Sequence, residues 1–327
     1  MSHWLYERIA ENDEDRKPSF SVQATHNWFR ALSFEIQSSH GKTNEELVTS
    51  CREFYKNVPR LKTQPVLGDI FEPLFFSVVY SMTLERFSNS LNAVPWIRPT
   101  VVVDWYYAIY FSIRSMFPVF GHNVAEDHSK TARFVASTFR TNLPYPLDMV
   151  AHREDGEDYS IFVFEKNPGF YDLNRTFMGF KPMAQGMLAQ YLKGTADWYA
   201  DRTKNKILEE QKINFTNFRS KKAREIRDRR LTTDVGFLHC AFRQRVKANY
   251  RDAVYLSYNY GEEINLDSFT ENLSTSAKFL SIMALAFVER KVGSAIVKSF
   301  VEDLDNNLRG VNLALPSEKY WKAFINR

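Results

Sequence analysis

The chain has 327 residues, 44% hydrophobic and 15% aromatic, which is ample apolar material for one large or two medium folded domains. This composition argues against disorder on any large scale. The formal net charge of +4 and the pI near 8.8 fall short of domains that bind duplexes by charge alone. Two cysteines without metal-ligand spacing argue against a disulfide framework and a structural zinc site. The chain also lacks a Gly-rich phosphate loop and a His-Glu-x-x-His motif, so no metal or cofactor is expected.

The N-terminal part, residues 1–98, is predicted to be a separate helical region. Residues 1–17 suggest a short charged helix, and residues 18–22 suggest a loop or an extended strand. Residues 43–56 begin with a Thr-x-x-Glu pattern, in which the two side chains cap the first turn of a helix.

Several prolines interrupt the next segment. Residues 59–73 are expected to form a loop, followed by an aromatic helix that runs to about Leu91. Pro95 and Pro99 then mark the clearest internal boundary, so residues 99–327 are predicted to form a second region, a helical bundle.

An amphipathic helix is predicted at the start of this bundle. Apolar residues recur there in steps of three and four: Val102, Trp105, Ile109, Ile113, Met116 and Phe120. Asp104, Tyr107 and Arg114 lie on a neighbouring face, where core packing does not require polar groups. Pro118 and Gly121 are expected to end or bend this helix before another begins at Asp127.

The helical pattern of apolar residues is interrupted over residues 144–182, which are predicted to form a small irregular or β insertion between helices. Residues 159–165 read as a strand and residues 167–169 as a turn. A long polar helix is expected at 195–231, and a final helix at 276–308.

The N-terminus lacks the pattern of a secretion signal. The most apolar window, Phe279 to Val288, is too short to span a bilayer. We therefore expect a cytoplasmic protein without membrane contact.

Residues 242–252 place two polar stripes beside an apolar one, at about 100° of rotation per residue. The apolar side, which should face the core, holds Phe242, Val246, Ala253 and Val254. One polar stripe holds His239, Arg243, Lys247 and Tyr250, and the other holds Arg245, Asn249 and Asp252. Such groups suit a fixed hydrogen-bond network, which either clamps neighbouring helices or forms a functional site. The helix of Tyr107 and Arg114 is expected to lie beside this one.

Positive charge is concentrated just upstream. Between Arg219 and Arg230 the net charge is +5, from seven basic and two acidic residues. The basic residues are Arg219, Lys221, Lys222, Arg224, Arg227, Arg229 and Arg230. With Lys247 they can follow a nucleic-acid backbone. A solvated helix face with pairs such as Arg224 and Asp228, or a docking face for an acidic protein, fits the same pattern.

Three motifs together resemble the HEPN superfamily of helical domains: Tyr-Tyr-Ala-x-Tyr-x-x-x-Arg at residues 106–114, His128 with Phe134, and Arg-x-x-Ala-Asn-Tyr-x-Asp at residues 245–252. The last motif is most similar to the branch that reads Arg-x-x-Ala-Asp-Tyr. The resemblance implies an up-and-down helical bundle that dimerises and places two copies of a polar motif across a cleft that cuts RNA.

Active members of that superfamily carry an Arg followed, after four to six residues, by a His. This chain departs from the pattern, since Tyr250 stands where the His is expected. A metal-independent endoribonuclease would then need other groups. Arg243, Arg245 and Lys247 can supply positive charge near the phosphate. His239 can titrate near neutral pH, and Tyr250 can position or donate a proton. The alternative, which we favour for His239, is a half-buried histidine at the start of a helix.

We expect a HEPN-like effector that binds or cuts RNA, a toxin or antiviral defence component acting as a homodimer. An antitoxin or another protein of a defence complex is a further expected partner. The alternative is a non-catalytic helical module that holds a partner protein or an RNA, its polar network being structural.

Overall fold

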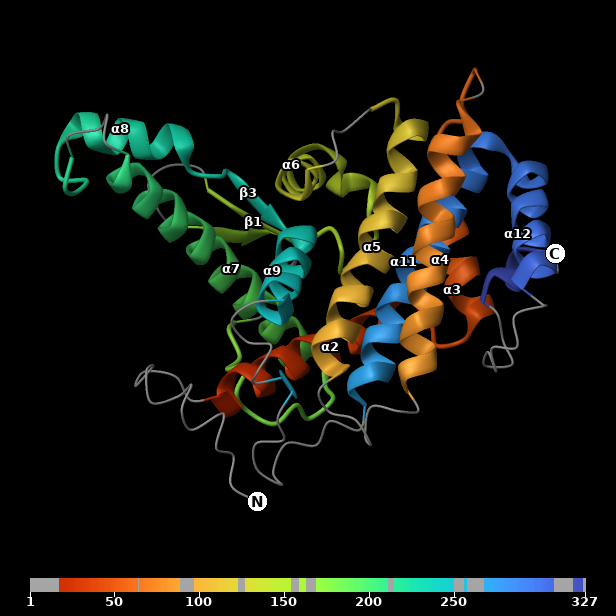
Figure 1. Ribbon diagram of the computed structural model, residues 1–327, viewed down its shortest axis with the longest axis horizontal. Helices are drawn as coiled ribbons and strands as arrows, with labels where there is room; N and C mark the ends of the chain where they lie inside the picture. The colour runs from red at the N-terminus through yellow and green to blue at the C-terminus, as the bar shows by residue number, and fades with distance from the viewer. Residues whose placement is uncertain are drawn as a thin grey trace. The chain divides into compact units, whose positions relative to one another are not determined.

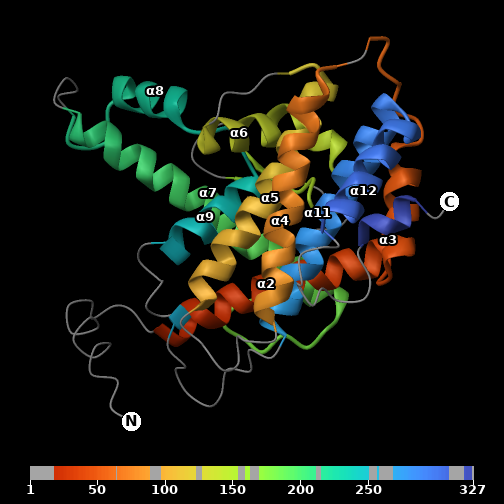
Figure 2. The same ribbon diagram turned by 45° about the vertical axis from the view of Figure 1, so that its right-hand side comes forward.

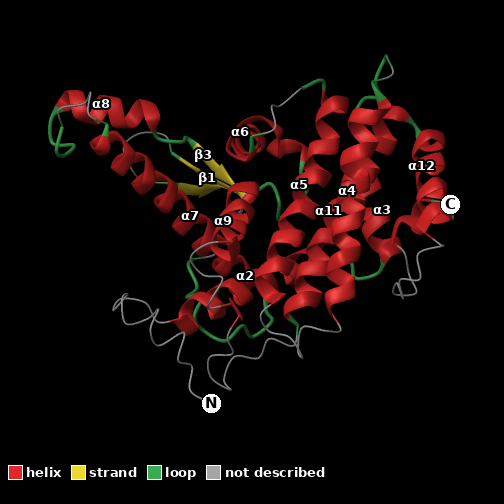
Figure 3. Cartoon of the chain, in the orientation of Figure 1, coloured by secondary structure: helices red, strands yellow, loops and turns green. Residues whose placement is uncertain are grey.

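The computed structural model describes residues 18–63, 65–88, 97–122, 127–153, 159–162, 169–210, 215–249, 256–257, 268–308 and 320–325. Helices dominate this part of the chain, and its strands form one small sheet (Figure 3). The predicted mainly α fold with a small β insertion is thereby confirmed. The chain divides into two compact units that differ from the predicted ranges 1–98 and 99–327. Unit 1 comprises Met1–Asn123, Leu173–Met178 and Gln244–Arg327, and unit 2 comprises Val124–Asp172 and Gly179–Arg243.

Unit 1 is a helical bundle built around α11. Its helices are α2 (Pro18–His40), α3 (Asn44–Tyr55), α4 (Leu67–Ser88), α5 (Arg98–Phe120), α11 (Phe269–Val292), α12 (Ser294–Leu308) and the 3₁₀ helix η4 (Tyr320–Phe324). Every residue from Phe279 to Val288 is buried, because α11 packs against helices on several sides (Figure 1). The apolar window seen in the sequence is thus the centre of a core helix.

Three buried serines join the central helices of unit 1. The Oγ of Ser77 in α4 lies 2.6 Å from that of Ser112 in α5 and 2.8 Å from that of Ser281 in α11. The Ser112 and Ser281 hydroxyls are 3.3 Å apart. Because buried hydroxyls need partners, this hydrogen-bonded ring satisfies polar atoms inside an apolar bundle.

Helix ends in unit 1 follow their sequence signals. Thr43 Oγ1 accepts from the Glu46 N–H at 3.2 Å, and Glu46 accepts from the Thr43 N–H at 2.9 Å, which confirms the predicted capping box. The α5 helix ends at Gly121, whose φ of 81° is a left-handed conformation that glycine adopts without strain. The prediction that Pro118 and Gly121 end or bend this helix is confirmed.

Other boundaries differ from the prediction. Helix α2 begins at Pro18, where we expected a loop or strand, because proline is tolerated in a first helical turn. Helix α4 begins at Leu67 and contains Pro73, so the loop is shorter than expected. Gly293, with φ 103°, divides the predicted final helix into α11 and α12. The charged helix predicted for residues 1–17 lies outside the described residues.

Among the residues that the structure describes, one helix is long and apolar enough to cross a membrane by length and composition alone. This segment is Leu67–Phe87 of α4, with a mean hydropathy of 1.2. Within unit 1, α4 packs against α5 and α11 (Figure 2). A helix of a bundle meets the same criteria of length and hydropathy when its apolar face packs against neighbouring helices.

Unit 2 combines short and long helices with the sheet. Its elements are α6 (His128–Phe134), the π-helical turn η2 (Val135–Phe139), the 3₁₀ turn η3 (Arg140–Asn142), β1 (Val150–His152), β2 (Ser160–Phe162), α7 (Lys181–Glu209), α8 (Lys221–Arg230), β3 (Asp234–Gly236) and the first part of α9 (Phe237–Asn249). Asp127 caps α6 by accepting from the Lys130 N–H at 2.9 Å, where a helix start was predicted.

The sheet has the order β2-β1-β3 and is antiparallel throughout. Strand β2 lies within the predicted strand 159–165, and residues 163–168 lie outside the described residues. The central strand β1 pairs Val150 with Phe162 on one side and with Gly236 on the other. The insertion is therefore tied to β3, which leads directly into α9.

Candidate nucleic-acid interface

The predicted long helix at 195–231 is two helices. Helix α7 ends at Glu209, and α8 begins after Ser220, whose hydroxyl accepts from the Ala223 N–H at 3.2 Å. This cap satisfies one of the N–H groups that a helix start leaves without an internal partner. Most of the basic segment therefore forms a separate ten-residue helix, Lys221–Arg230.

Most of the cations of this segment are exposed. The exposed residues are Arg219, Lys221, Lys222, Arg224, Arg229 and Arg230. Arg227 differs, because it is 5% exposed and its Nε donates to Asp228 at 2.9 Å. Its guanidinium also lies 5.8 Å from the centre of the Phe218 ring. Arg227 was predicted to bind nucleic acid, but its buried side chain is engaged within the fold.

The charge balance of α8 also differs from the pairing considered in the sequence. Asp228 pairs with Arg227 and with Arg153, which approaches it at 3.8 Å, and not with Arg224. Arg230 donates to Glu210 at 2.6 Å. Within the described ranges, five cations have no carboxylate at ion-pair distance: Arg219, Lys221, Lys222, Arg224 and Arg229. These five residues, which we call the α8 cation set, are available to an external anion.

Helix α9 is rotated relative to the prediction. Phe242 and Val246, expected on the core side, are only half-buried, whereas Leu238, Ala241 and Ala248 are fully buried. Ala253 and Val254 lie outside the described residues. The polar residues of α9 are thus partly buried by neighbouring helices and do not form one exposed stripe.

His239 is fully buried inside unit 2. It is 1% exposed, its Nδ1 accepts from the Gly236 N–H at 3.2 Å, and its ring meets Tyr199 edge-on at 5.1 Å. Burial, aided by the charge of Arg133, lowers the pKa of His239 to about 3. His239 is therefore neutral near pH 7, which is at odds with the expectation that it titrates there.

Arg243 is anchored on α7. Its Nη1 donates to the Thr195 hydroxyl at 3.2 Å, and its guanidinium lies 5.5 Å from the Tyr191 ring centre and 5.6 Å from that of Trp198. A cation over aromatic faces is stabilised by the ring quadrupole. Arg243 thus fixes the surroundings of Trp198, a role for which its sequence motif gave no sign.

Arg245 is held within unit 1. Its Nη2 donates to the Tyr107 hydroxyl at 3.1 Å, and its guanidinium lies over the rings of Tyr106 and Tyr107. This hydrogen bond confirms the expected contact between the two helices that carry the motifs. Arg114 lies instead over Tyr110 of its own helix.

Tyr107 belongs to a row of stacked aromatic rings on α4 and α5. Its ring lies 5.4 Å from Tyr80, and Tyr80 lies 6.0 Å from Phe111. Burial raises the pKa of the nearby Asp104 to about 6. The charges of Asp104 and Tyr107, after burial itself, raise the pKa of Tyr80.

The rest of the predicted site is divided. His128 of α6, one of the residues that carry the resemblance, stacks on Phe242 of α9 at 5.7 Å within unit 2. Lys247 is half-buried and Asn249 is exposed. Tyr250 and Asp252 were predicted to be site residues, and they lie outside the described residues.

No metal site emerges from this geometry. In the described part of the chain, no group of three or more His, Cys, Asp or Glu side chains could hold a metal ion. Cys240, beside His239, is buried, and burial raises the pKa of its thiol to about 12. The thiol is therefore protonated at neutral pH and unsuited to metal binding.

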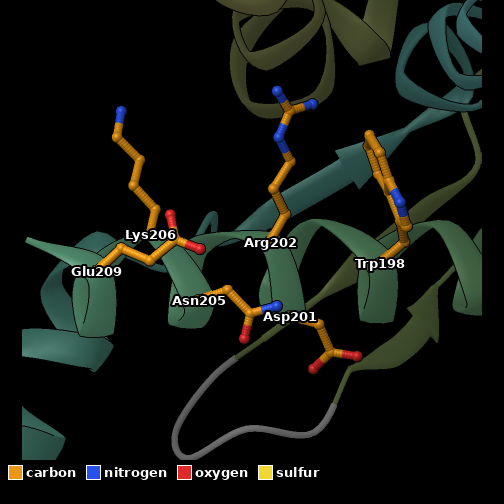
Figure 4. Close-up of a pocket in the computed structure, with 6 residues that line it drawn as sticks. All are labelled: Trp198, Asp201, Arg202, Asn205, Lys206 and Glu209. Carbon is orange, nitrogen blue, oxygen red and sulfur yellow. The ribbon is translucent and has the colours of Figure 1, made fainter. Parts of the chain in front are cut away.

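A hollow along α7 was missed by the sequence reasoning. It has a volume of about 620 Å³ and is lined by Trp198, Asp201, Arg202, Asn205, Lys206 and Glu209 (Figure 4). We call this hollow the α7 groove. Its lining residues recur at three- and four-residue spacing around one tryptophan, and this signal was present in the sequence.

Comparison of the chain with protein-family models, with curated proteins and with solved structures found no match.

Proposed function

We propose that this chain is an RNA-binding helical protein and that the α8 cation set makes its main contact with the RNA backbone. The observation that carries the proposal is the excess of exposed charge without a carboxylate partner on α8 and at Arg219, two residues before this helix. Lysine and arginine that neutralise phosphates release condensed counterions, which drives binding without any sequence readout.

The surroundings of these cations support this reading over a solvated helix face. A solvated basic helix is commonly stabilised by ion pairs between residues one turn apart. Asp228, the acceptor expected for Arg224, is engaged by Arg153 and Arg227. Arg224 and Arg229 are therefore not needed to balance charge within unit 2.

Cleavage is not part of this proposal. Cutting RNA by attack of a 2′-hydroxyl needs groups that accept and return protons, and His239 was the candidate that titrates nearest neutral pH. Its burial and lowered pKa remove it from that role. The nuclease activity implied by the HEPN resemblance stays a prediction that depends on other residues, Tyr250 and Asp252 among them.

The cellular role also stays a prediction. The sequence leads us to expect a toxin or antiviral defence component that acts as a homodimer in the cytoplasm, with an antitoxin or a defence-complex protein as a further partner. The mass of the purified protein in solution, together with analysis of co-purifying nucleic acid, tests this expectation. A monomer free of RNA would count against it.

The test of RNA binding compares two double variants in fluorescence anisotropy with labelled single-stranded RNA. Lys222→Ala with Arg229→Ala removes two members of the α8 cation set. Arg60→Ala with Lys62→Ala removes one exposed arginine and one exposed lysine in unit 1 and serves as the matched control. Alanine is a good helix former, so the α8 variant should keep its fold.

We expect the α8 variant to bind more weakly and to flatten the dependence of log K on log salt by roughly 1.4, about 0.7 for each lost phosphate contact. The control should bind like the unmodified protein. Equal affinity in all three proteins would refute the proposal. Loss of binding to an acidic partner protein, with no RNA binding by any variant, would favour the interaction module instead.

A further inference from the structure

The α7 groove presents one aromatic wall and several hydrogen-bonding groups. In Figure 4, Trp198, Arg202 and Lys206 project from one margin of α7, and Asp201 and Asn205 lie along the other. The volume of about 620 Å³ falls within the range of pockets that hold small organic ligands. The groove therefore suits a flat ligand with polar edges.

The aromatic wall is held in place. The guanidinium of Arg243 lies 5.6 Å from the centre of the Trp198 ring, and Thr195 fixes that guanidinium through a hydrogen bond of 3.2 Å. Arg202, which is exposed, lies 5.4 Å from the same ring centre. A flat base can stack on an indole or on a guanidinium plane, and this pair offers both surfaces.

The charge of the groove argues against phosphate as the group that it holds. Arg202 and Lys206 are balanced by Asp201 and Glu209, and Asp201 has Lys204 at 3.4 Å. The carboxylate and amide oxygens of Asp201 and Asn205 accept hydrogen bonds from amino groups and hydroxyls. Base amino groups and ribose hydroxyls are donors of this kind, whereas a phosphate oxygen is not.

We propose that the α7 groove binds an unpaired nucleotide, with its base stacked on Trp198 or Arg202 and its ribose or base edge against Asp201 and Asn205. This inference rests on the proposed RNA binding by α8, the helix that packs against α7 within unit 2. A base inside a duplex is already stacked and cannot reach an indole. The protein therefore prefers single-stranded over double-stranded RNA.

The experiment measures the affinity of variants for a single-stranded RNA and for a blunt duplex of the same sequence. Trp198→Ala removes the aromatic wall, and Trp198→Phe keeps a smaller one. Asn205→Trp leaves Trp198 in place and fills the groove from an exposed position, which guards against a simple folding defect. Phe170→Ala is the matched control, because Phe170 is an aromatic residue of unit 2, 53% exposed, that does not line the groove.

We expect Trp198→Ala and Asn205→Trp to weaken single-strand binding about ten-fold, the loss of one stacked base, and to leave duplex binding unchanged. Trp198→Phe should restore most of the affinity, and Phe170→Ala should have no effect. If the unmodified protein binds RNA through α8 but Trp198→Ala and Asn205→Trp bind single strands normally, the groove proposal is wrong.

Titration with adenosine monophosphate distinguishes the source of the nucleotide. If the unmodified protein binds no RNA but binds this mononucleotide, and Asn205→Trp abolishes that binding, the RNA function fails while the groove remains a nucleotide site. If neither RNA nor mononucleotide binds, both proposals fail.

Discussion

The basic residues of α8 and α9 differ in what surrounds them. On α8, Lys222 and Arg229 are exposed and have no carboxylate at ion-pair distance within the described residues. On α9, Arg243 is held by a hydroxyl and two aromatic rings. Arg227 shows that a residue of α8 can also be held, when its side chain points into the fold.

This difference separates cations that serve the fold from cations that can serve a ligand. A run of positive charge in a sequence can contain both kinds of cation. The direction of each side chain in the folded protein determines which kind it is. The α8 cation set can bind an anion at little cost, whereas Arg243 would first have to leave Thr195 and its rings.

The strongest test of the comparison is Arg227→Ala. Removing this buried side chain loses its packing on Phe218 and its hydrogen bond to Asp228, so we expect a loss of about 2 to 3 kcal/mol in the free energy of unfolding. Chemical denaturation measures it. Arg229→Ala, two residues along the same helix, is the control and should change stability by less than about 0.5 kcal/mol. Equal losses in the two variants would remove the distinction between held and free cations.

Arg243→Ala extends the test to α9. Loss of the hydrogen bond to Thr195 and of the two ring contacts should reduce unfolding free energy by about 2 kcal/mol. Arg202→Ala is the matched control, because Arg202 lies over the same Trp198 ring but is exposed. Its expected loss is below about 1 kcal/mol, and a larger loss from Arg202 than from Arg243 would contradict our assignment.

The lowered pKa of the buried His239 leads us to predict that the fold loses stability in acid. Its pKa of about 3 lies below the ordinary value of 6.5, so the unfolded chain binds a proton first as pH falls. The stability from the neutral ring is fully present above pH 6.5 and is lost as pH falls toward 3, by about 1.4 kcal/mol per pH unit.

His239→Gln should flatten this pH dependence in unfolding measurements between pH 6.5 and 4. The same substitution at the exposed His122, His122→Gln, serves as the matched control. A variant at position 239 with the same slope as the unmodified protein would mean that this histidine is not the group that titrates.

The smallest expected effect concerns the free cations themselves. Lys222→Ala with Arg229→Ala should alter the melting temperature by no more than a degree or two, because exposed substitutions rarely exceed about 0.5 kcal/mol. Thermal melts at low and high salt check this. A large destabilisation would show that these side chains stabilise the fold and are not available to a ligand.

Much of the fold could be predicted because its signals are local. The capping box at Thr43, the end of α5 at Gly121 and the start of α6 at Asp127 each depend on a few neighbouring residues. The divisions after Glu209 and at Gly293 were missed, because apolar and polar periodicity continues on both sides of them.

The candidate site was harder to predict because burial decides its chemistry. The helix of Tyr107 lies beside the helix of Arg245, as expected, and the two residues form a hydrogen bond. Spacing does not reveal that His239 is sealed, that Arg227 points inward, or that α9 is rotated away from the predicted core side. Those facts depend on how the helices and the sheet pack in three dimensions.

The ring of Ser77, Ser112 and Ser281 constrains how the sequence of unit 1 can diverge. Each hydroxyl is a partner of the other two, so replacing one serine by alanine leaves the remaining two with fewer partners in an apolar interior. Exchanging all three for alanine together removes that conflict. In related chains we therefore expect these positions to vary as a set, and their joint covariation would show that the three helices pack at the same level.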